Sequence, residues 1–173
     1  MAHALVVLVA AAAQCQTEQM TVKLIPISSQ QFPAWLKRSC QEYEADLVAT
    51  GETPFEAHRR AHESLEAAFP EDAPSVDNAV FDVVDEGASV GYLWVGTDSS
   101  EDPRSWWVWD IVIDAQHRGK GWGRATMDLA EDYARSQGAS TLGLSVFGFN
   151  HAAKKLYESM GYETVTTKMK KSL

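Results

Sequence analysis

The chain has 173 residues, of which 45% are hydrophobic and 23% charged, and this composition predicts one compact domain rather than two. Its formal net charge of −9 argues against a nucleic acid or an anionic membrane surface as the main partner, because phosphate groups repel such a chain. Its two cysteines, Cys15 and Cys40, are too few for a disulfide framework, and neither lies beside a histidine at metal-ligand spacing. We therefore expect no bound metal.

The charges divide between two regions of the chain. Residues 41–86 hold 13 acidic side chains against 2 basic ones, whereas residues 116–171 hold 9 basic side chains against 5 acidic ones. The first region suits a cationic ligand and the second an anionic one.

The chain begins with an apolar run at residues 4–13, which has the length of a signal-peptide core. The run lacks a preceding basic segment and is too short to span a bilayer. We interpret residues 1–19 as an extension upstream of a natural start at Met20, so that residues 20–173 form the folded domain. A cleaved signal and a peripheral helix are the alternatives.

The first elements in chain order are a strand and two helices. Residues 21–27 alternate apolar and polar side chains as a short strand does. Residues 31–49 and 53–69 predict two helices, because Gly51 separates them and Thr53 before a proline is typical of a helix start.

Three consecutive strands follow and predict an antiparallel meander. Residues 78–84 and 89–95 are rich in valine and aromatic residues and are joined by a short turn, and residues 105–113 predict the third strand. The pattern then predicts a helix, a strand, a second helix and a last strand, at residues 121–137, 141–147, 150–160 and 162–169.

The stretch "QHRGKGWGRA", residues 116–125, lies between a predicted strand and a predicted helix. Its three glycines let the backbone approach a ligand, and the free N–H groups of the first helical turn point toward that ligand. Three cationic side chains add positive charge, so a pyrophosphate is the natural guest. The glycine spacing fits neither a Rossmann fingerprint nor a P-loop.

Two motifs carry a resemblance to a known family. Residues 118–123 resemble the Arg/Gln-x-x-Gly-x-Gly/Ala pattern of the GNAT acetyltransferase superfamily, and "NHAAKKLYESMGYE", residues 150–163, is similar to that superfamily's second signature. The resemblance implies an α/β GNAT fold, with a central mixed, mostly antiparallel twisted sheet flanked by helices. It also implies an acetyl-CoA site where the strand at 105–113 and the strand at 141–147 splay apart.

The resemblance assigns the acetyl-CoA contacts to three segments. Backbone groups of residues 111–113 would hold the pantetheine arm as an added strand is held, and amides of residues 119–124 would hold the pyrophosphate. Asn150 is expected to cap its helix, to contact the cofactor, or both. The expected cofactor-binding residues are Ile111, Val112, Ile113, Arg118, Gly119, Lys120, Gly121, Trp122, Gly123, Arg124, Asn150 and Ala153.

Acetyl transfer to an amine needs proton movements at two places. An alkyl amine with a pKa of about 10.4 is mostly protonated at pH 7, so a base must take its proton before it attacks a thioester. The expelled thiolate then needs a proton. The resemblance assigns that acid role to Tyr157, and the alternative is a buried aromatic on the apolar stripe of its helix.

The base is where the sequence departs from the family pattern. Many members carry a Glu or His at the positions that align with Trp107 and Trp109. The only acid on that strand is Asp110, and strand alternation directs it to the face opposite Trp109 unless a bulge re-aims it. Asp110 is therefore either the base or a structural, water-holding group. Weaker candidates for the base are His58, His62, Glu56 and Glu63.

Trp107 and Trp109 share one face of their strand and would line the acceptor pocket, where aromatic rings and nearby acids favour a cation. We expect an acetyl-CoA-dependent N-acetyltransferase that acts on a primary amine, small molecule or peptide, by direct attack in a ternary complex. The alternative is a non-catalytic acyl-CoA sensor of the same fold. Because acetyl-CoA is an intracellular substrate, we expect a cytoplasmic protein without a membrane partner; a homodimer stays open.

Overall fold

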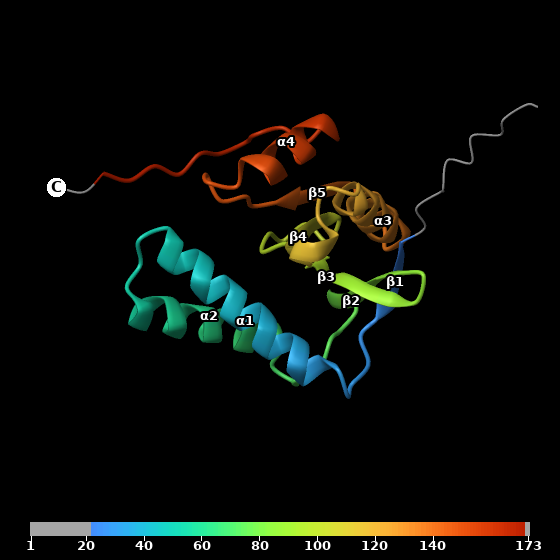
Figure 1. Ribbon diagram of the computed structural model, residues 1–173, viewed down its shortest axis with the longest axis horizontal. Coiled ribbons are helices and arrows are strands. Elements are labelled where there is room, and N and C mark those ends of the chain that lie inside the picture. The colour runs from blue at the N-terminus through green and yellow to red at the C-terminus, as the bar shows by residue number, and fades with distance from the viewer. Residues whose placement is uncertain (1–21, 172–173) are drawn as a thin grey trace, which may run out of the picture.

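A computed structural model describes residues 22–171 of the chain, so the prediction for residues 1–19 lies outside the described residues. Its frame is one five-stranded sheet with the spatial order β1-β2-β3-β4-β5 (Figure 1). Neighbouring strands are antiparallel except β4 and β5, which are parallel. The strands are β1 (Lys23–Pro26), β2 (Asn78–Asp85), β3 (Ala88–Thr97), β4 (Ser105–Ile113) and β5 (Thr141–Leu144).

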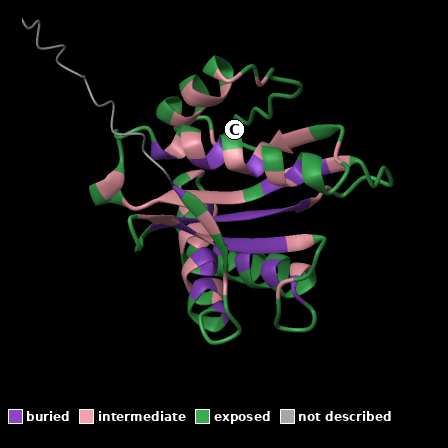
Figure 2. Cartoon of the chain, turned by 90° about the vertical axis from the view of Figure 1, so that its right-hand side faces the viewer, coloured by how far each residue is buried: buried purple, intermediate pink, exposed green. Residues whose placement is uncertain are grey.

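Helices cover both faces of the sheet, and Figure 2 shows the sheet as the middle layer. One face packs against α1 and α2, and the other packs against α3. The helices are α1 (Phe32–Ala49), α2 (Pro54–Ala68), α3 (Trp122–Ser136) and α4 (His151–Ser159), and a short 3₁₀ turn, η1, spans Ala115–His117. The predicted α/β class and the order of elements through α4 are confirmed.

Strand β3 joins the two layers of the core because its side chains alternate between faces. Leu93 and Val95 are fully buried on the α3 side, whereas Tyr92 and Trp94 are buried on the α1 side. This two-sided burial explains why the sequence of β3 is almost continuously apolar. The central strands therefore form a rigid base for β4.

Strand β4 contains a β-bulge at Trp109. Trp94 pairs with Asp110 and Val95 pairs with Val108, so Trp109 is the extra residue between the two pairs. The bulge directs Asp110 to the α1 face, where Ser39 donates a hydrogen bond to it, although regular alternation would have directed it to the α3 face. The bulge thus places Trp109 and Asp110 on the same side of the sheet.

The predicted strand at residues 162–169 is wrong, because the described chain contains no strand there. A strand needs a partner for its backbone hydrogen bonds, and β5 ends at Leu144, short of the predicted residue 147. The segment after α4 runs out from the sheet in Figure 1 and exposes Val165 by 91% and Met169 by 88%. Its alternating pattern reflects local propensity without a neighbouring edge.

Among residues 22–171, no helix is both long enough and apolar enough to cross a membrane.

Candidate active site

The glycine-rich turn leads from the end of β4 into α3. Gly119 and Gly121 have φ angles of +77° and +85°, a left-handed conformation that side-chain-bearing residues rarely adopt. Gly121 is the N-cap of α3, and the first backbone bond back to it comes from the amide of Ala125 at 3.2 Å. The glycines are therefore needed to turn the chain into the helix.

The turn presents backbone donors without acceptors. Within the described chain, no backbone hydrogen bond is recorded for the amides of residues 119–124. Unpaired amides at a helix N-terminus attract an anion, and the helix dipole adds to that attraction. The free amides therefore suit an anion, which is the kind of ligand that the sequence predicts here.

The three cations of the turn are each held by a neighbour. Nε of Arg118 donates to the carbonyl oxygen of Ile113 at 2.9 Å. Nζ of Lys120 lies 4.9 Å from the ring centroid of Trp122, and Arg124 donates to Oγ of Ser159 on α4. All three side chains are solvent-exposed, so their positive charges lie at the surface around the free amides.

Four further residues of the predicted cofactor set have structural roles in the helices. A Cβ atom added at Gly123 would lie 3.3 Å from Cδ2 of Leu156, so glycine lets α4 approach α3 closely. Oδ1 of Asn150 accepts a hydrogen bond from the amide of Ala153 at 3.1 Å, so the predicted helix cap is confirmed. The side chain of Trp122 is buried in the core, so only its backbone amide, which makes no hydrogen bond within the described chain, is available to a ligand.

The edge of β4 opens beyond Val108. The parallel pairing of β4 with β5 runs from Ser105 to Val108, and its last pair is Val108 with Leu144. The stretch from Trp109 to Ile113 pairs only with β3, so its outer edge has backbone groups free for an extended ligand, except for the carbonyl oxygen of Ile113, which accepts from Arg118. The side chains of Ile111 and Ile113 pack against the α3 core, which is compatible with backbone contacts at the edge.

Asp110 is partly buried behind this edge. Its Oδ2 accepts hydrogen bonds from Oη of Tyr92 at 2.7 Å and from Oγ of Ser39 at 2.8 Å. No hydrogen bond is recorded to Oδ1 among residues 22–171. Burial raises the pKa of Asp110 to about 6, against the opposing effect of the two hydrogen bonds, and the charges of Glu42 and Asp46 raise it further.

Tyr157 projects from α4 into the edge of the α3 core. Its ring makes an edge contact with Tyr162 at a centroid distance of 5.9 Å. Burial raises the pKa of Tyr157, and the negative charge of Asp110 raises it as well. The phenol therefore keeps its proton at neutral pH, as an acid must.

Trp107 and Trp109 meet at a hollow of about 190 Å³, lined also by Asp98, Ser99 and Ser145. Their ring centroids lie 6.3 Å apart, and Trp109 stacks on Trp94 at 5.8 Å with 41% of its surface exposed. Gly143 of β5 makes room for the ring of Trp107, which a Cβ atom there would strike at 2.3 Å. The structure thus brings the two predicted wall residues together.

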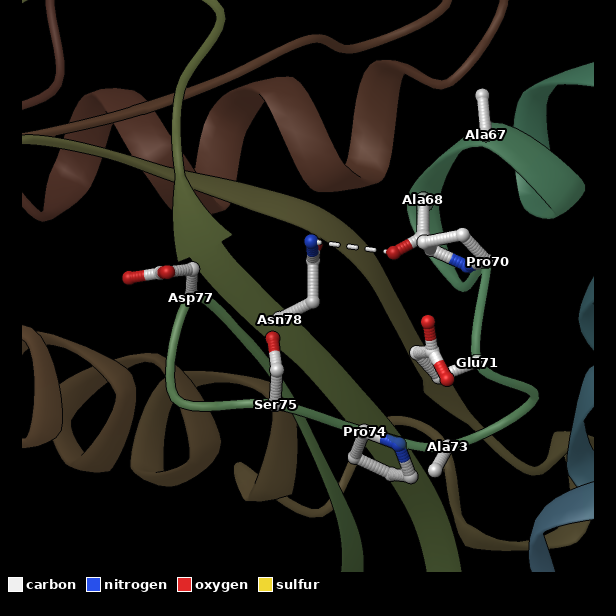
Figure 3. Close-up of a pocket in the computed structure, with 9 residues that line it drawn as sticks. All are labelled: Ala67, Ala68, Pro70, Glu71, Ala73, Pro74, Ser75, Asp77 and Asn78. Carbon is white, nitrogen blue, oxygen red and sulfur yellow. Dashed lines mark hydrogen bonds between the residues drawn. The ribbon is translucent and has the colours of Figure 1, made fainter.

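A larger hollow of about 430 Å³ lies between the end of α2 and the start of β2 (Figure 3). It is lined mainly by small and proline residues, and Nδ2 of Asn78 donates to the carbonyl oxygen of Ala68 there at 3.3 Å. None of the predicted site residues lines it.

The weaker candidates for the base lie on the exposed side of α2. Nδ1 of His58 pairs with Glu44 at 3.0 Å, and the ring of His62 is tilted against that of His58 with the ring centroids 4.3 Å apart. Glu56 and Glu63 pair with Arg59 on their own helix. Solvent-facing pairs of this kind leave Asp110 as the better placed carboxylate.

The sequence interpretation missed three residues around Asp110: Ser39, Glu42 and Tyr92. Tyr92 lies in a strand where an aromatic residue is expected to be core, and Ser39 and Glu42 lie on a helix far away in sequence. The available signal was that Ser39 and Glu42 are three residues apart and so share a helix face.

A five-stranded mixed sheet with a glycine-rich turn beside an open strand edge is the arrangement expected of an acyltransferase. The model of the Acetyltransferase (GNAT) family matches residues 38–162. The chain belongs to the GNAT family of acetyltransferases.

The chain is similar along most of its length to the uncharacterized N-acetyltransferase YycN of Bacillus subtilis (strain 168), with 26% identity over 156 residues, 89% of this chain and 100% of that protein. The crystal structure of YycN superposes with a TM-score of 0.81, covering 88% of this chain and 99% of the other.

Shorter stretches match two relatives with named acceptors. Streptothricin acetyltransferase of Streptomyces lavendulae is 45% identical over 53 residues, 31% of this chain and 28% of that protein. The [ribosomal protein bS18]-alanine N-acetyltransferase of Escherichia coli (strain K12) is 36% identical over 59 residues, 34% of this chain and 40% of that protein.

Proposed function

We propose that this enzyme is an acetyl-CoA-dependent N-acetyltransferase that modifies a primary amine by direct attack in a ternary complex. The observation that carries the proposal is the continuity of the open edge of β4 with the free amides of residues 119–124. An extended pantetheine arm suits the edge, and a pyrophosphate suits the amides. Acetyl-CoA supplies the thioester from which the acetyl group is transferred.

Asp110 is our candidate for the base. Its Oδ1 is unpaired within residues 22–171 and its pKa of about 6 leaves it ionised at neutral pH, so it can accept the proton of the acceptor ammonium group. The bulge at Trp109 supports this role, since it turns Asp110 to the same face as the tryptophan wall. The main argument for a non-catalytic sensor is that tryptophans replace acids at positions 107 and 109. The new orientation of Asp110 weakens that argument, because it supplies a carboxylate on the same face.

Tyr157 is our candidate for the acid that protonates the departing thiolate. Its raised pKa keeps the phenol protonated at neutral pH, so the phenol is available to donate a proton to the thiolate. Its place on α4, close behind the anion-binding turn, suits a group that acts on the sulfur end of the pantetheine arm.

The acceptor is a primary amine of a small molecule or a peptide. Aromatic rings at Trp107 and Trp109 and the carboxylate of Asp98 suit a cationic group. The two relatives with named acceptors are named for streptothricin and for an alanine of a ribosomal protein, so both small-molecule and peptide amines belong in the first panel. We place the enzyme in the cytoplasm, because acetyl-CoA is made and used there.

The direct test is a screen of small-molecule and peptide amines with acetyl-CoA, read out as release of the CoA thiol and as acetylated product by mass spectrometry. We expect at least one amine to give turnover that Asp110→Asn lowers by about 10²-fold or more. Binding of acetyl-CoA without turnover on any amine would contradict the proposal.

A further inference from the structure

Tyr92 lies between two carboxyl groups. Its Oη is 2.7 Å from Oδ2 of Asp110 and 2.9 Å from Oε2 of Glu42. The residue is 2% exposed, and its ring is held edge-on against Trp35 at 6.0 Å, with the guanidinium of Arg38 at 5.0 Å from the ring centroid. The hydroxyl is therefore fixed at the point where the two carboxyl groups meet.

The proton count of this cluster is unusual. A phenol has one proton and can donate it to only one of the two carboxyl groups at a time. The contact with the second carboxyl group becomes favourable when that group carries a proton and donates it to the phenol oxygen. Both contacts of Tyr92 are therefore hydrogen bonds when the three side chains share one proton in addition to that of the phenol.

The two ends of the cluster face different environments. Asp110 is partly buried and lies behind the open edge of β4, with an unpaired Oδ1 in the described chain. The side chain of Glu42 is 40% exposed on α1, and its Oε1 accepts from Nε of Arg38 at 2.9 Å. The hydroxyl of Tyr92 is thus the link between a buried carboxylate and a solvent-exposed one.

We propose that Tyr92 and Glu42 form a proton relay that returns Asp110 to its ionised state after each turnover, an inference that rests on the proposed function. Asp110 takes one proton from the acceptor ammonium group at Oδ1. A half-turn of the carboxyl group about Cβ–Cγ brings that proton to Tyr92. As Oη accepts it, the phenol passes its own proton to Oε2 of Glu42, which releases it to water.

Each step of the relay moves one proton and leaves Tyr92 neutral, which its buried ring requires, since burial and the two nearby carboxyl groups raise the pKa of this phenol. Titratable and charged groups face the cluster from the elements that pack against it. Helix α1 contributes Ser39, Glu42, Asp46 and Arg38, and β3 contributes Tyr92. Strand β2 contributes Asp82, which is the cross-strand partner of Tyr92 and interacts with the charge of Arg38. Helix α4 contributes Tyr157, and Asp114 binds Arg38 after the end of β4.

Two variants interrupt the relay at different places. Tyr92→Phe keeps the ring and removes the hydroxyl, and Glu42→Gln keeps the hydrogen-bonding side chain but removes the exposed proton acceptor. We expect either change to lower kcat by about tenfold in dilute buffer. Small basic buffers such as imidazole should restore the rate, because they take the proton that the relay no longer removes. The KM for acetyl-CoA should not change.

The pH profile gives a second readout that packing alone would not move. Tyr92→Phe removes a donor to the ionised Asp110, so the acid limb of kcat/KM should move to higher pH. Glu42→Gln removes a negative charge, so that limb should move to lower pH. Glu44→Gln on the same helix is the matched control, because Glu44 pairs with His58 instead, and its profile should coincide with that of the unmodified enzyme.

If both relay variants kept the wild-type rate in dilute buffer while Asp110→Asn still abolished turnover, the relay would be overturned. The proposed function would then stand. If the unmodified enzyme turned over no amine, the proposed function itself would fail. A rate loss in both variants that buffer bases did not relieve would also overturn the relay. Glu42→Gln keeps the test decisive if Tyr92→Phe folds poorly, since Glu42 lies at the surface.

Discussion

Arg118 links the glycine-rich turn to the end of β4 by a hydrogen bond, which its Nε donates to the carbonyl oxygen of Ile113 at 2.9 Å. The open strand edge and the free amides of the turn are consequently held in one fixed relation. A ligand that contacts both therefore binds to a preorganised surface, which lowers the entropic penalty of binding.

Gly121→Val should abolish acetyl-CoA binding. A branched side chain is strained at a φ of +85°, so it should distort the turn that presents the free amides. Calorimetry with acetyl-CoA measures the loss. Gly138→Val is the matched control, because Gly138 has a φ of +88° just beyond the other end of α3 and should lose stability without losing affinity. Unchanged binding in Gly121→Val would show that the pyrophosphate lies elsewhere.

Tyr157→Phe should lower kcat by about 10²-fold or more while the affinity for acetyl-CoA stays the same. The ring and its packing remain, and only the proton offered to the thiolate is lost, so the effect belongs to the transition state. Turnover and binding are measured on the same preparation. Tyr162→Phe, whose ring touches that of Tyr157, is the control and should keep its rate. An unaltered rate in Tyr157→Phe would reduce the residue to a packing role.

The activity should rise with pH through the pKa of Asp110. Because the ionised carboxylate accepts the proton, kcat/KM should increase along a limb with an apparent pKa of about 6 and level off above it. Asp110→Asn should remove this limb together with most of the activity. A profile without a titration between pH 5 and 7, a window of about one pH unit on each side, would argue against Asp110 as the base.

The stability should change with pH in the opposite direction. The folded pKa of Asp110, about 6, lies above its ordinary value of 3.8, so the folded state binds the proton more tightly than the unfolded state does. This contribution is complete below pH 3.8 and is lost as the pH rises through 6, by at most about 3 kcal/mol. Asp110→Asn should therefore melt higher than the unmodified enzyme at pH 8, and this difference should shrink toward pH 4.

Trp109→Ala should raise the KM for the acceptor by about tenfold and leave acetyl-CoA binding unchanged. The ring is half-exposed at the small hollow and loses cation–π and apolar contacts to an amine when truncated. Steady-state kinetics with each substrate varied in turn measures the effect. Phe55→Ala on α2 also removes an exposed aromatic ring and should alter neither constant.

Local patterns predicted the parts of this molecule that depend on local physics. The valine and aromatic content of β2 and β3, the helical stripe of α3 and the glycines at 119 and 121 are all features of short stretches of sequence. The sequence left the bulge in β4 as an open alternative. The bulge arises from the pairing of β4 with β3, which ends at Thr97, eight residues before β4 begins at Ser105.

Contacts between distant segments were beyond the reach of a single sequence. Tyr92, Glu42 and Asp110 come from three elements, and nothing in their spacing indicates that their oxygens meet. The error at residues 162–169 has the same origin: a strand-like pattern is necessary for a strand, but the neighbouring edge that completes it is set by the whole fold.

The bulge in β4 also changes the distance between the aromatic wall and the carboxylate. In a regular strand, two side chains on one face are two residues apart, a translation of about 6.6 Å. Trp109 and Asp110 share a face although they are consecutive, and the Cα atoms across one peptide are only about 3.8 Å apart. A regular strand would have turned the carboxylate to the opposite face of the sheet, so the bulge sets the two groups one peptide unit apart on one face, a spacing that would suit a compact acceptor.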